Sequence, residues 1–191
     1  MIGVTLKHGN LVGFILLNNG VKIMEEIKIG DLLLRKPNLE DAFLAHVNFF
    51  SSEKTAKYMY WRVTKNEEEV KQRIERWLNT YKDNMLYFII FNNEPIGFLT
   101  SVKFDEETYG DIGLCVGEKF IKKGNGSKIL SWLVNDLKSK GAKKIYYTCM
   151  KENIASIKLA EKIGFKYQSE MKKINPKNNT KYIELTYLLN I

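Results

Sequence analysis

The chain has 191 residues, of which 45% are hydrophobic and 27% charged, and this is an ordinary composition for one globular domain. No apolar run approaches the roughly 18 residues that a membrane-spanning helix needs, so we expect no membrane partner. Cys115 and Cys149 are too few for a disulfide framework. We therefore expect free thiols and a cytoplasmic protein.

The net charge of +8 has two interpretations. One is an acidic partner, such as a nucleotide phosphate or a ribonucleoprotein. The other is a lysine-rich composition spread over solvated faces. The basic residues are scattered and interleaved with glutamate, which favours the second interpretation. We therefore do not expect a nucleic-acid partner.

Residues 1–28 form an N-terminal extension to a more regular chain. They read as two short strands around residues 7–10, followed by a turn at 18–20. We expect a short hairpin here, and we leave open whether it is an edge for a homodimer. Residues 29–191 are expected to form the main domain.

The first part of this domain predicts one strand and two helices. The strand covers 32–35, and Asn38 is placed to cap a helix over 39–50. Thr64 or Asn66 can cap the second helix, whose first turn is acidic. Its apolar residues recur at helical spacing and are Val70, Ile74, Trp77, Leu78 and Tyr81.

Strands and helices then alternate through the rest of the chain. The predicted strands cover 86–91, 96–104, 111–116, 144–150, 165–172 and 182–189, and the predicted helices cover 124–139 and 153–164. An antiparallel meander therefore precedes a β-α-β-α-β-β order. This order predicts an α/β (α+β) fold with a mixed sheet and helices on both faces.

The stretch between the third of these strands and the following helix carries the chemistry. Gly124 and Gly126 let the backbone turn tightly and approach a ligand closely. The first N–H groups of the helix lack intrahelical partners and suit a pyrophosphate. Lys122 and Lys123 add positive charge, and Ser127 adds a hydroxyl. The same glycines are also compatible with a simple helix-start turn that binds no ligand.

Two common phosphate loops do not fit this stretch. The Walker pattern has a different spacing of glycine and lysine. The dinucleotide fingerprint requires a third glycine where Ile129 stands. That fingerprint also opens a βαβ unit, whereas an antiparallel meander comes before this loop.

Several motifs together resemble the GNAT superfamily of N-acetyltransferases. Residues 121–126 resemble its acetyl-CoA-binding motif, Q/R-x-x-G-x-G/A. Residues 153–165 are similar to its later N-x-x-S and E-K-x-G-F signature. Residues 111–113 and 58–61 resemble the subgroup that contains ribosomal-protein N-terminal acetyltransferases. The resemblance covers about residues 29–190.

The resemblance implies the GNAT fold, with a mixed, mostly antiparallel central sheet of six to seven strands and about four flanking helices. It implies acetyl-CoA as cosubstrate, no metal, and acetyl transfer to a primary amine on a protein N-terminus or a small molecule. The cofactor-binding residues expected from the loop and the resemblance are Leu114, Cys115, Val116, Ile121, Lys122, Lys123, Gly124, Asn125, Gly126, Ser127, Asn153 and Ser156.

Two positions depart from the family pattern. Ile121 stands where the motif has Gln or Arg, so one polar phosphate contact is absent. Ala160 stands where many members have a tyrosine that protonates the leaving thiolate. This second departure motivates an alternative function, a non-catalytic CoA-binding sensor or scaffold.

Amine acetylation requires the amine to lose a proton. Asp111 is the first candidate for the base, with a water chain or Glu106 and Glu107 as alternatives, but it could simply be a turn residue paired with a lysine. Ser156 is the best-placed hydroxyl for the thiolate, and it could equally be an ordinary exposed helix serine. Backbone N–H groups of 114–116 would stabilise the oxyanion if the strand is bulged there.

The acceptor pocket is the least determined part of the site. Tyr58, Tyr60 and Trp61 are expected to line it, or else to be core aromatics. Two histidines and two cysteines without metal spacing indicate no zinc site.

Overall fold

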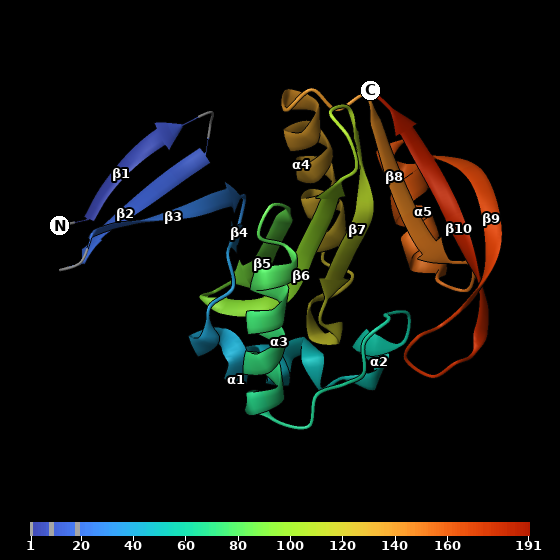
Figure 1. The fold of residues 1–191 in the computed structure, drawn as a ribbon, viewed down its shortest axis with the longest axis horizontal. Coiled ribbons are helices and arrows are strands. Elements are labelled where there is room, and N and C mark those ends of the chain that lie inside the picture. Colours follow the sequence, from blue (N-terminus) through green and yellow to red (C-terminus); the bar gives the residue numbers. More distant parts are fainter. Residues whose placement is uncertain (1, 8–9, 18–19) are drawn as a thin grey trace.

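The computed structural model describes residues 2–7, 10–17 and 20–191. Over these ranges, ten strands form one sheet with the order β1-β2-β3-β4-β5-β6-β7-β8-β10-β9 (Figure 1). All neighbouring strands are antiparallel except β7 and β8. The strands are β1 (Ile2–Lys7), β2 (Asn10–Leu17), β3 (Gly20–Ile29), β4 (Leu32–Arg35), β5 (Met85–Phe91), β6 (Glu94–Lys103), β7 (Thr108–Val116), β8 (Lys144–Met150), β9 (Lys166–Ile174) and β10 (Lys181–Asn190).

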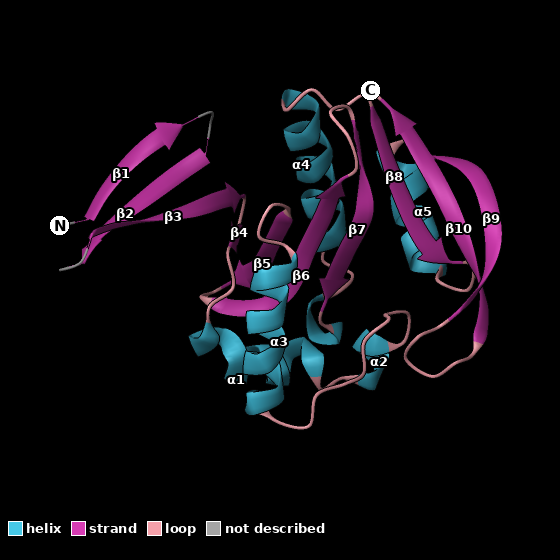
Figure 2. Ribbon diagram, in the orientation of Figure 1, coloured by secondary structure: helices cyan, strands magenta, loops and turns pink. Residues whose placement is uncertain are grey.

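Helices cover both faces of this sheet, as the element order predicted (Figure 2). On one face α4 and α5 pack over the larger apolar core, which includes Leu130, Leu133 and Ala160. On the other face the helices before β5 bury an aromatic cluster that includes Phe49 and Phe50. The helices are η1 (Leu39–Asp41), α1 (Ala42–Ala45), η2 (His46–Phe50), α2 (Glu53–Ala56), α3 (Glu67–Thr80), η3 (Glu118–Phe120), α4 (Asn125–Ser139) and α5 (Ile154–Ile163).

The N-terminal part adds three strands, where the sequence predicted two. β1, β2 and β3 form an antiparallel meander, and β3 pairs with β4 (Figure 1). The connection between the two strands predicted around 7–10 and the turn predicted at 18–20 include residues 8–9 and 18–19, which lie outside the described residues. β4 to β10 then account for the six to seven strands expected of the main domain. β3 spans Gly20–Ile29 and so crosses the boundary predicted between residues 28 and 29. The division into an extension over 1–28 and a main domain over 29–191 stays a prediction.

The helix predicted over 39–50 exists as three consecutive pieces of different winding. It starts as the 3₁₀ turn η1, continues as α1 and widens into the π-helical η2, where the Ser51 N–H donates to the carbonyl of His46. The wider winding accompanies the complete burial of the neighbouring Phe49 and Phe50.

A partly buried ion pair fixes the start of these helices. Asn38 and Asp41 form a reciprocal capping box, as the predicted cap at Asn38 requires. The two carboxylate oxygens of Asp41 also accept from Arg35 on β4, at 2.6 and 2.8 Å. Strand and helix are thereby joined by a bidentate contact.

The second helix, α3, begins after Asn66, whose side chain accepts from the N–H of Glu69. Thr64, the alternative cap, is instead buried and lies 2.8 Å from the imidazole Nδ1 of His46. The short helix α2 was not predicted, although Ser52 caps it with an ordinary side-chain hydrogen bond. Over the described ranges every helix is too short or too polar to span a lipid bilayer.

Candidate active site

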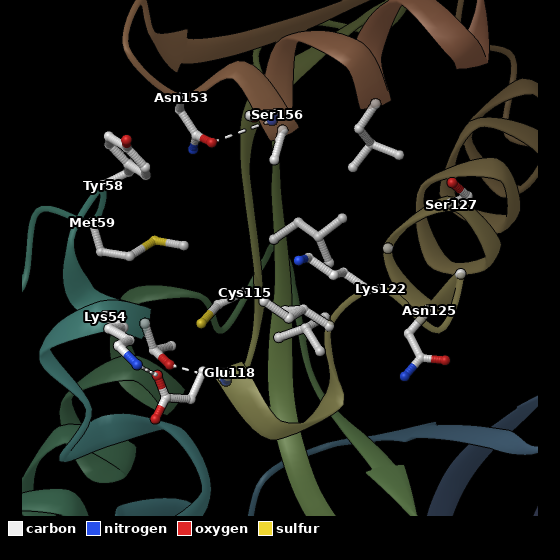
Figure 3. Close-up of a pocket in the computed structure, with 18 of the residues that line it drawn as sticks. Lys54, Tyr58, Met59, Cys115, Glu118, Lys122, Asn125, Ser127, Asn153 and Ser156 are labelled. Carbon is white, nitrogen blue, oxygen red and sulfur yellow. Dashed lines mark hydrogen bonds and ion pairs between the residues drawn. The ribbon is translucent and has the colours of Figure 1, made fainter.

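A cavity of about 840 Å³ lies where the carboxyl end of β7 meets the amino ends of α4 and α5 (Figure 3). The loop around α2 closes its remaining side. The strands β7 and β8 make this opening, because they pair only at Thr108–Lys144 and Tyr109–Ile145. Residues from both strands beyond these pairs line the cavity. Its volume falls in the range of small-molecule sites.

The loop before α4 has the backbone geometry that a close approach to a ligand requires. Gly124 adopts φ +80° and Lys122 φ +62°, and both values lie in the left-handed region. No side chain caps α4, whereas Asn66 and Asn153 cap α3 and α5. The first helical bond of α4 runs from the N–H of Lys128 to Gly124. The preceding amides are therefore available to an anion at the positive end of the helix dipole.

Nearly all of the predicted cofactor residues line this one cavity. The exception is Lys123, whose ammonium group lies 5.8 Å from the ring centre of Phe120. Lys122 extends toward the middle of the cavity (Figure 3). The predicted residues that line it are Leu114, Cys115, Val116, Ile121, Lys122, Gly124, Asn125, Gly126, Ser127, Asn153 and Ser156.

Side chains from α2 complete the wall, and the sequence reading missed them. Lys54 lies 3.6 Å from the carboxylate of Glu118, and Thr55 accepts from the Glu118 N–H at 3.2 Å. These contacts join α2 to the turn that follows β7. Only a Ser-x-x-Thr pattern at Ser52 signals this helix in the sequence, and that signal is weak.

Ser156 lies in the first turn of α5 and faces the cavity. Asn153 caps this turn, because its side chain accepts from the Ser156 N–H at 3.2 Å. The hydroxyl of Ser156 lies 2.7 Å from the hydroxyl of Tyr147 on β8. Burial raises the pKa of Tyr147 to about 12, so this phenol is neutral near pH 7. Ala160, at the position of the family's tyrosine, is fully buried and has no hydroxyl. Ser156 and Tyr147 supply the hydroxyl groups on this side of the cavity.

Tyr147 was not predicted as a site residue. Its position two residues before Cys149, in a strand that leads to the Asn153 cap, was the available signal. The missing family tyrosine at Ala160 was a second reason to search for another hydroxyl nearby.

The backbone of β7 also contributes to the cavity. The Gly117 N–H donates to the carbonyl of Ile96 on β6. Because backbone groups alternate along an antiparallel strand, the N–H and C=O groups of Cys115 also point toward β6. The amide groups of Leu114 and Val116 consequently point to the opposite side, where β8 has diverged. They form an unpaired strand edge inside the cavity.

The strand is not bulged at 114–116, so the condition set for an oxyanion donor there is not met. Residues 113–116 pair regularly with 97–100, and the register shift lies opposite Ser101, at Asp111 and Ile112. Asp111 has φ +47°, which aspartate tolerates better than most residues. An oxyanion donor on β7 therefore has to come from the unpaired edge rather than from a bulge.

A second cavity of about 280 Å³ lies beside the first and contains Asp111. The two cavities share Tyr58, Tyr147 and Ser156, which therefore lie between them. Burial raises the pKa of Tyr81 in the same cavity, a hydrogen bond with Thr100 opposes this rise, and the nearby carboxylate of Asp111 adds to it. Glu106 and Glu107, the alternative bases, instead pair with surface lysines.

The predicted aromatic residues also lie at this second cavity. Tyr58 and Tyr60 line it, and so does Trp61. Trp61 additionally belongs to the aromatic core, with its ring 5.2 Å from that of Phe50 and under the guanidinium of Arg73. Trp61 thus fits both interpretations of the sequence.

Both cysteines are buried free thiols, as expected. Cys115 lies in the first cavity and Cys149 in the second. Burial raises the pKa of each thiol, so neither is a reactive thiolate near pH 7.

Comparison with known proteins agrees with this architecture. The family model for the acetyltransferase (GNAT) domain matches residues 31–166. The chain therefore belongs to the GNAT acetyltransferase family. It is also 31% identical over 84 residues to the uncharacterized N-acetyltransferase YobR of Bacillus subtilis (strain 168). That match covers 44% of this chain and 34% of YobR, so the chain spans about a third of this relative's length.

Solved structures share the fold over most of the chain. The microcin C7 self-immunity acetyltransferase MccE, in complex with acetyl-CoA and AMP, is 22% identical with a TM-score of 0.76. The match covers 86% of this chain and 96% of MccE. RimL, a ribosomal L7/L12 alpha-N-protein acetyltransferase in complex with coenzyme A, is 21% identical with a TM-score of 0.76. It covers 87% of this chain and 98% of RimL, and at this identity both likenesses concern the fold alone.

Proposed function

We propose that the protein transfers an acetyl group from acetyl-CoA to a primary amine by direct attack on the thioester. The observation that carries this proposal is the single cavity that runs from the uncapped start of α4 to the Ser156–Tyr147 pair. One end suits a pyrophosphate, and the other end offers hydroxyl groups to a leaving thiolate.

Each end of acetyl-CoA has a place in this proposal. The free amides of Asn125, Gly126 and Ser127 bind the pyrophosphate, and Lys122 adds positive charge. The unpaired edge of β7 binds the extended pantetheine arm through the amide groups of Leu114 and Val116. Coenzyme A and acetyl-CoA in the related structures support this choice of cosubstrate.

The reaction needs three groups from the protein. The neutral amine attacks the thioester carbon, and an N–H group at the free edge of β7 stabilises the oxyanion. The C–S bond then breaks, and the hydroxyl of Ser156, backed by Tyr147, hydrogen-bonds to the departing thiolate. Asp111, which is exposed in the adjoining cavity, accepts the amine proton directly or through water.

The acceptor is proposed to be a protein N-terminus or a small molecule that carries a primary amine. RimL, whose fold this chain shares, is named for its action on ribosomal L7/L12. The cavity around Asp111 and Tyr60 is lined largely by aromatic and polar side chains, which fits a cationic ligand entering from solvent.

Thiol release from acetyl-CoA in the presence of a panel of amines tests the proposal. We expect release that depends on the amine. Binding of acetyl-CoA without turnover on any amine would instead favour the alternative, a non-catalytic CoA-binding module. The lack of a side-chain hydroxyl at Ala160 supports this alternative. Absence of acetyl-CoA binding would contradict both functions.

Asp111→Asn tests the assigned base separately. Asparagine tolerates the left-handed backbone at this position, so the fold should survive. We expect a lower rate and a flattened pH–rate profile. A variant whose profile matches that of the wild type would remove Asp111 from the mechanism.

A further inference from the structure

A buried carboxylate on β10 is not used by the reaction described so far. Glu184 is 7% exposed, and its Oε2 accepts from the hydroxyl of Tyr60 at 2.9 Å and that of Tyr182 at 3.4 Å. Its Oε1 lies 2.5 Å from the ammonium group of Lys173 on the edge strand β9. A charge held this far from water requires a compensating partner, and Lys173 is its only cationic partner among the described ion pairs.

Glu184 lies in a third cavity, of about 680 Å³. This outer cavity shares Tyr60, Asp111 and Thr148 with the cavity around Asp111. The cavity around Asp111 in turn shares Ser156 with the cofactor cavity. The three cavities therefore adjoin one another, with the carboxylate of Glu184 in the outer cavity and that of Asp111 between it and the cavity that contains Ser156.

Lys173 is an unusual partner for so buried a group. Its side chain is 43% exposed, and it lies on β9 at the edge of the sheet. Lys173, Tyr182 and Glu184 share one face, because Lys173 pairs with Tyr182 and residues two apart on a strand point the same way. The solvated ammonium of Lys173 can leave by rotation of its own side chain, whereas the buried carboxylate of Glu184 stays in place.

We propose that the carboxylate of Glu184 binds the ammonium group of the acceptor, and we call this position the ammonium seat. The ammonium group of Lys173 occupies the seat when no acceptor is bound. The ligand class is a primary ammonium, either the α-ammonium of a peptide or the end of an alkylamine. Such a group can replace Lys173 because it has the same charge and the same three N–H donors. This inference rests on the proposed function, since it assigns the entry point of its acceptor.

The phenols around Glu184 suit this role. Burial raises the pKa of Tyr60, with hydrogen bonds to Tyr182 and Glu184 adding to the effect, so the phenol stays neutral and donates to the carboxylate. The rings of Tyr60 and Tyr182 lie 5.9 Å apart and form an aromatic wall beside the seat. Aromatic faces stabilise a cation next to a carboxylate.

The test compares variants of the two residues in the full-length protein. Thiol release is measured at saturating acetyl-CoA with two probes, spermidine and trialanine amide, so that the two sources of ammonium are separated. Glu184→Gln should raise KM for the amine about tenfold or more, because the ammonium then meets a neutral amide oxygen in place of a carboxylate. Lys173→Met should lower KM by about threefold, because a partly exposed competing ion pair is removed.

A matched control pair lies elsewhere on this part of the sheet. Glu170 on β9 and Lys151, in the turn that follows β8, form an exposed ion pair at 2.9 Å, and neither residue lines the three cavities. Glu170→Gln and Lys151→Met should therefore leave KM within about twofold, as surface changes do. Thermal unfolding of each variant shows that it is folded. In a Glu184→Gln background the effect of Lys173→Met should vanish, because the two residues act through one contact.

Two results would overturn the inference. One is amine-dependent thiol release in which Glu184→Gln, though folded, shifts the amine KM no more than Glu170→Gln does. The other is a Lys173→Met variant with a higher amine KM. If no amine supports thiol release, calorimetric titration of both probes into the coenzyme A complex decides. If the amine binds to the wild type and not to Glu184→Gln, the ammonium seat is upheld and only the proposed transfer is contradicted. If the amine binds equally to both, the ammonium seat is contradicted.

Discussion

The hydroxyls of Tyr147 and Ser156 lie 2.7 Å apart, one on β8 and the other in the first turn of α5. The Tyr147 ring is 4% exposed and packs 5.6 Å from the ring of Phe165, so it cannot move far. It holds the Ser156 hydroxyl at the wall of the 840 Å³ cavity. Such preorganised donors are worth most where charge develops in the transition state.

Ser156→Ala should therefore lower turnover while leaving acetyl-CoA binding nearly unchanged. We expect a loss of about 10- to 100-fold in kcat, at the lower end for one donor to a developing anion. Tyr147→Phe should give a smaller loss, because Ser156 remains. Ser139→Ala, at the exposed end of α4, is the control. Unchanged turnover in Ser156→Ala would mean that another donor serves the thiolate.

Gly126→Asp should weaken acetyl-CoA binding by about tenfold or more, because a carboxylate then competes with the pyrophosphate for the start of α4. Gly126→Asn has nearly the same shape without the charge and is the matched control. A Cβ at this position meets only Leu159, at an ordinary 3.5 Å. Both variants should fold, and equal affinity for acetyl-CoA in the two would contradict a pyrophosphate site here.

The raised pKa of Tyr147 makes a prediction about alkaline stability. The unfolded phenol ionises near its ordinary pKa of about 10, and the folded phenol only at about 12. Unfolding therefore releases a proton in this window, and the free energy of unfolding should fall as pH rises from 10 to 12. Urea unfolding at pH 8 and pH 11 should show a smaller fall for Tyr147→Phe than for the wild type. An equal fall would show that the phenol is not held neutral.

Asp41→Ala should destabilise the fold by about 3 kcal/mol, because it leaves the partly buried guanidinium of Arg35 without its partner and removes the capping box. Glu40→Ala, next to it and exposed, should change the free energy of unfolding by less than about 0.5 kcal/mol. Denaturant unfolding of the two variants measures the difference. Similar midpoints would show that the ion pair contributes little beyond its own desolvation.

The backbone geometry of the glycine loop before α4 could be predicted because its requirements are local. Gly124 has the left-handed backbone that favours glycine, and Asn153 caps α5 with its own side chain. Each of these features depends on a few consecutive residues. The same holds for the alternating strands, whose predicted bounds lie close to those of the structure, and for the cap of α3 at Asn66.

The contacts around Glu184 could not be predicted, because they join distant parts of the chain. Tyr60 and Glu184 are separated by 124 positions, and only the completed sheet brings them together. The bulge at Asp111 likewise depends on the register between β6 and β7. Local pattern indicated that distortion was available near Gly113, but the pairing of two strands decided where it occurs.

β7 and β8 pair over only two residues of each strand, so beyond these pairs their facing backbone edges are not joined by hydrogen bonds. A pantetheine arm lying along β7 would act as a surrogate strand for the amides of Leu114 and Val116. Hydrogen exchange should then slow at these two amides when coenzyme A is added, and change little at Cys115, which β6 already protects. On this proposal, the free edge of β7 is paired by the bound cofactor and not by another segment of the polypeptide.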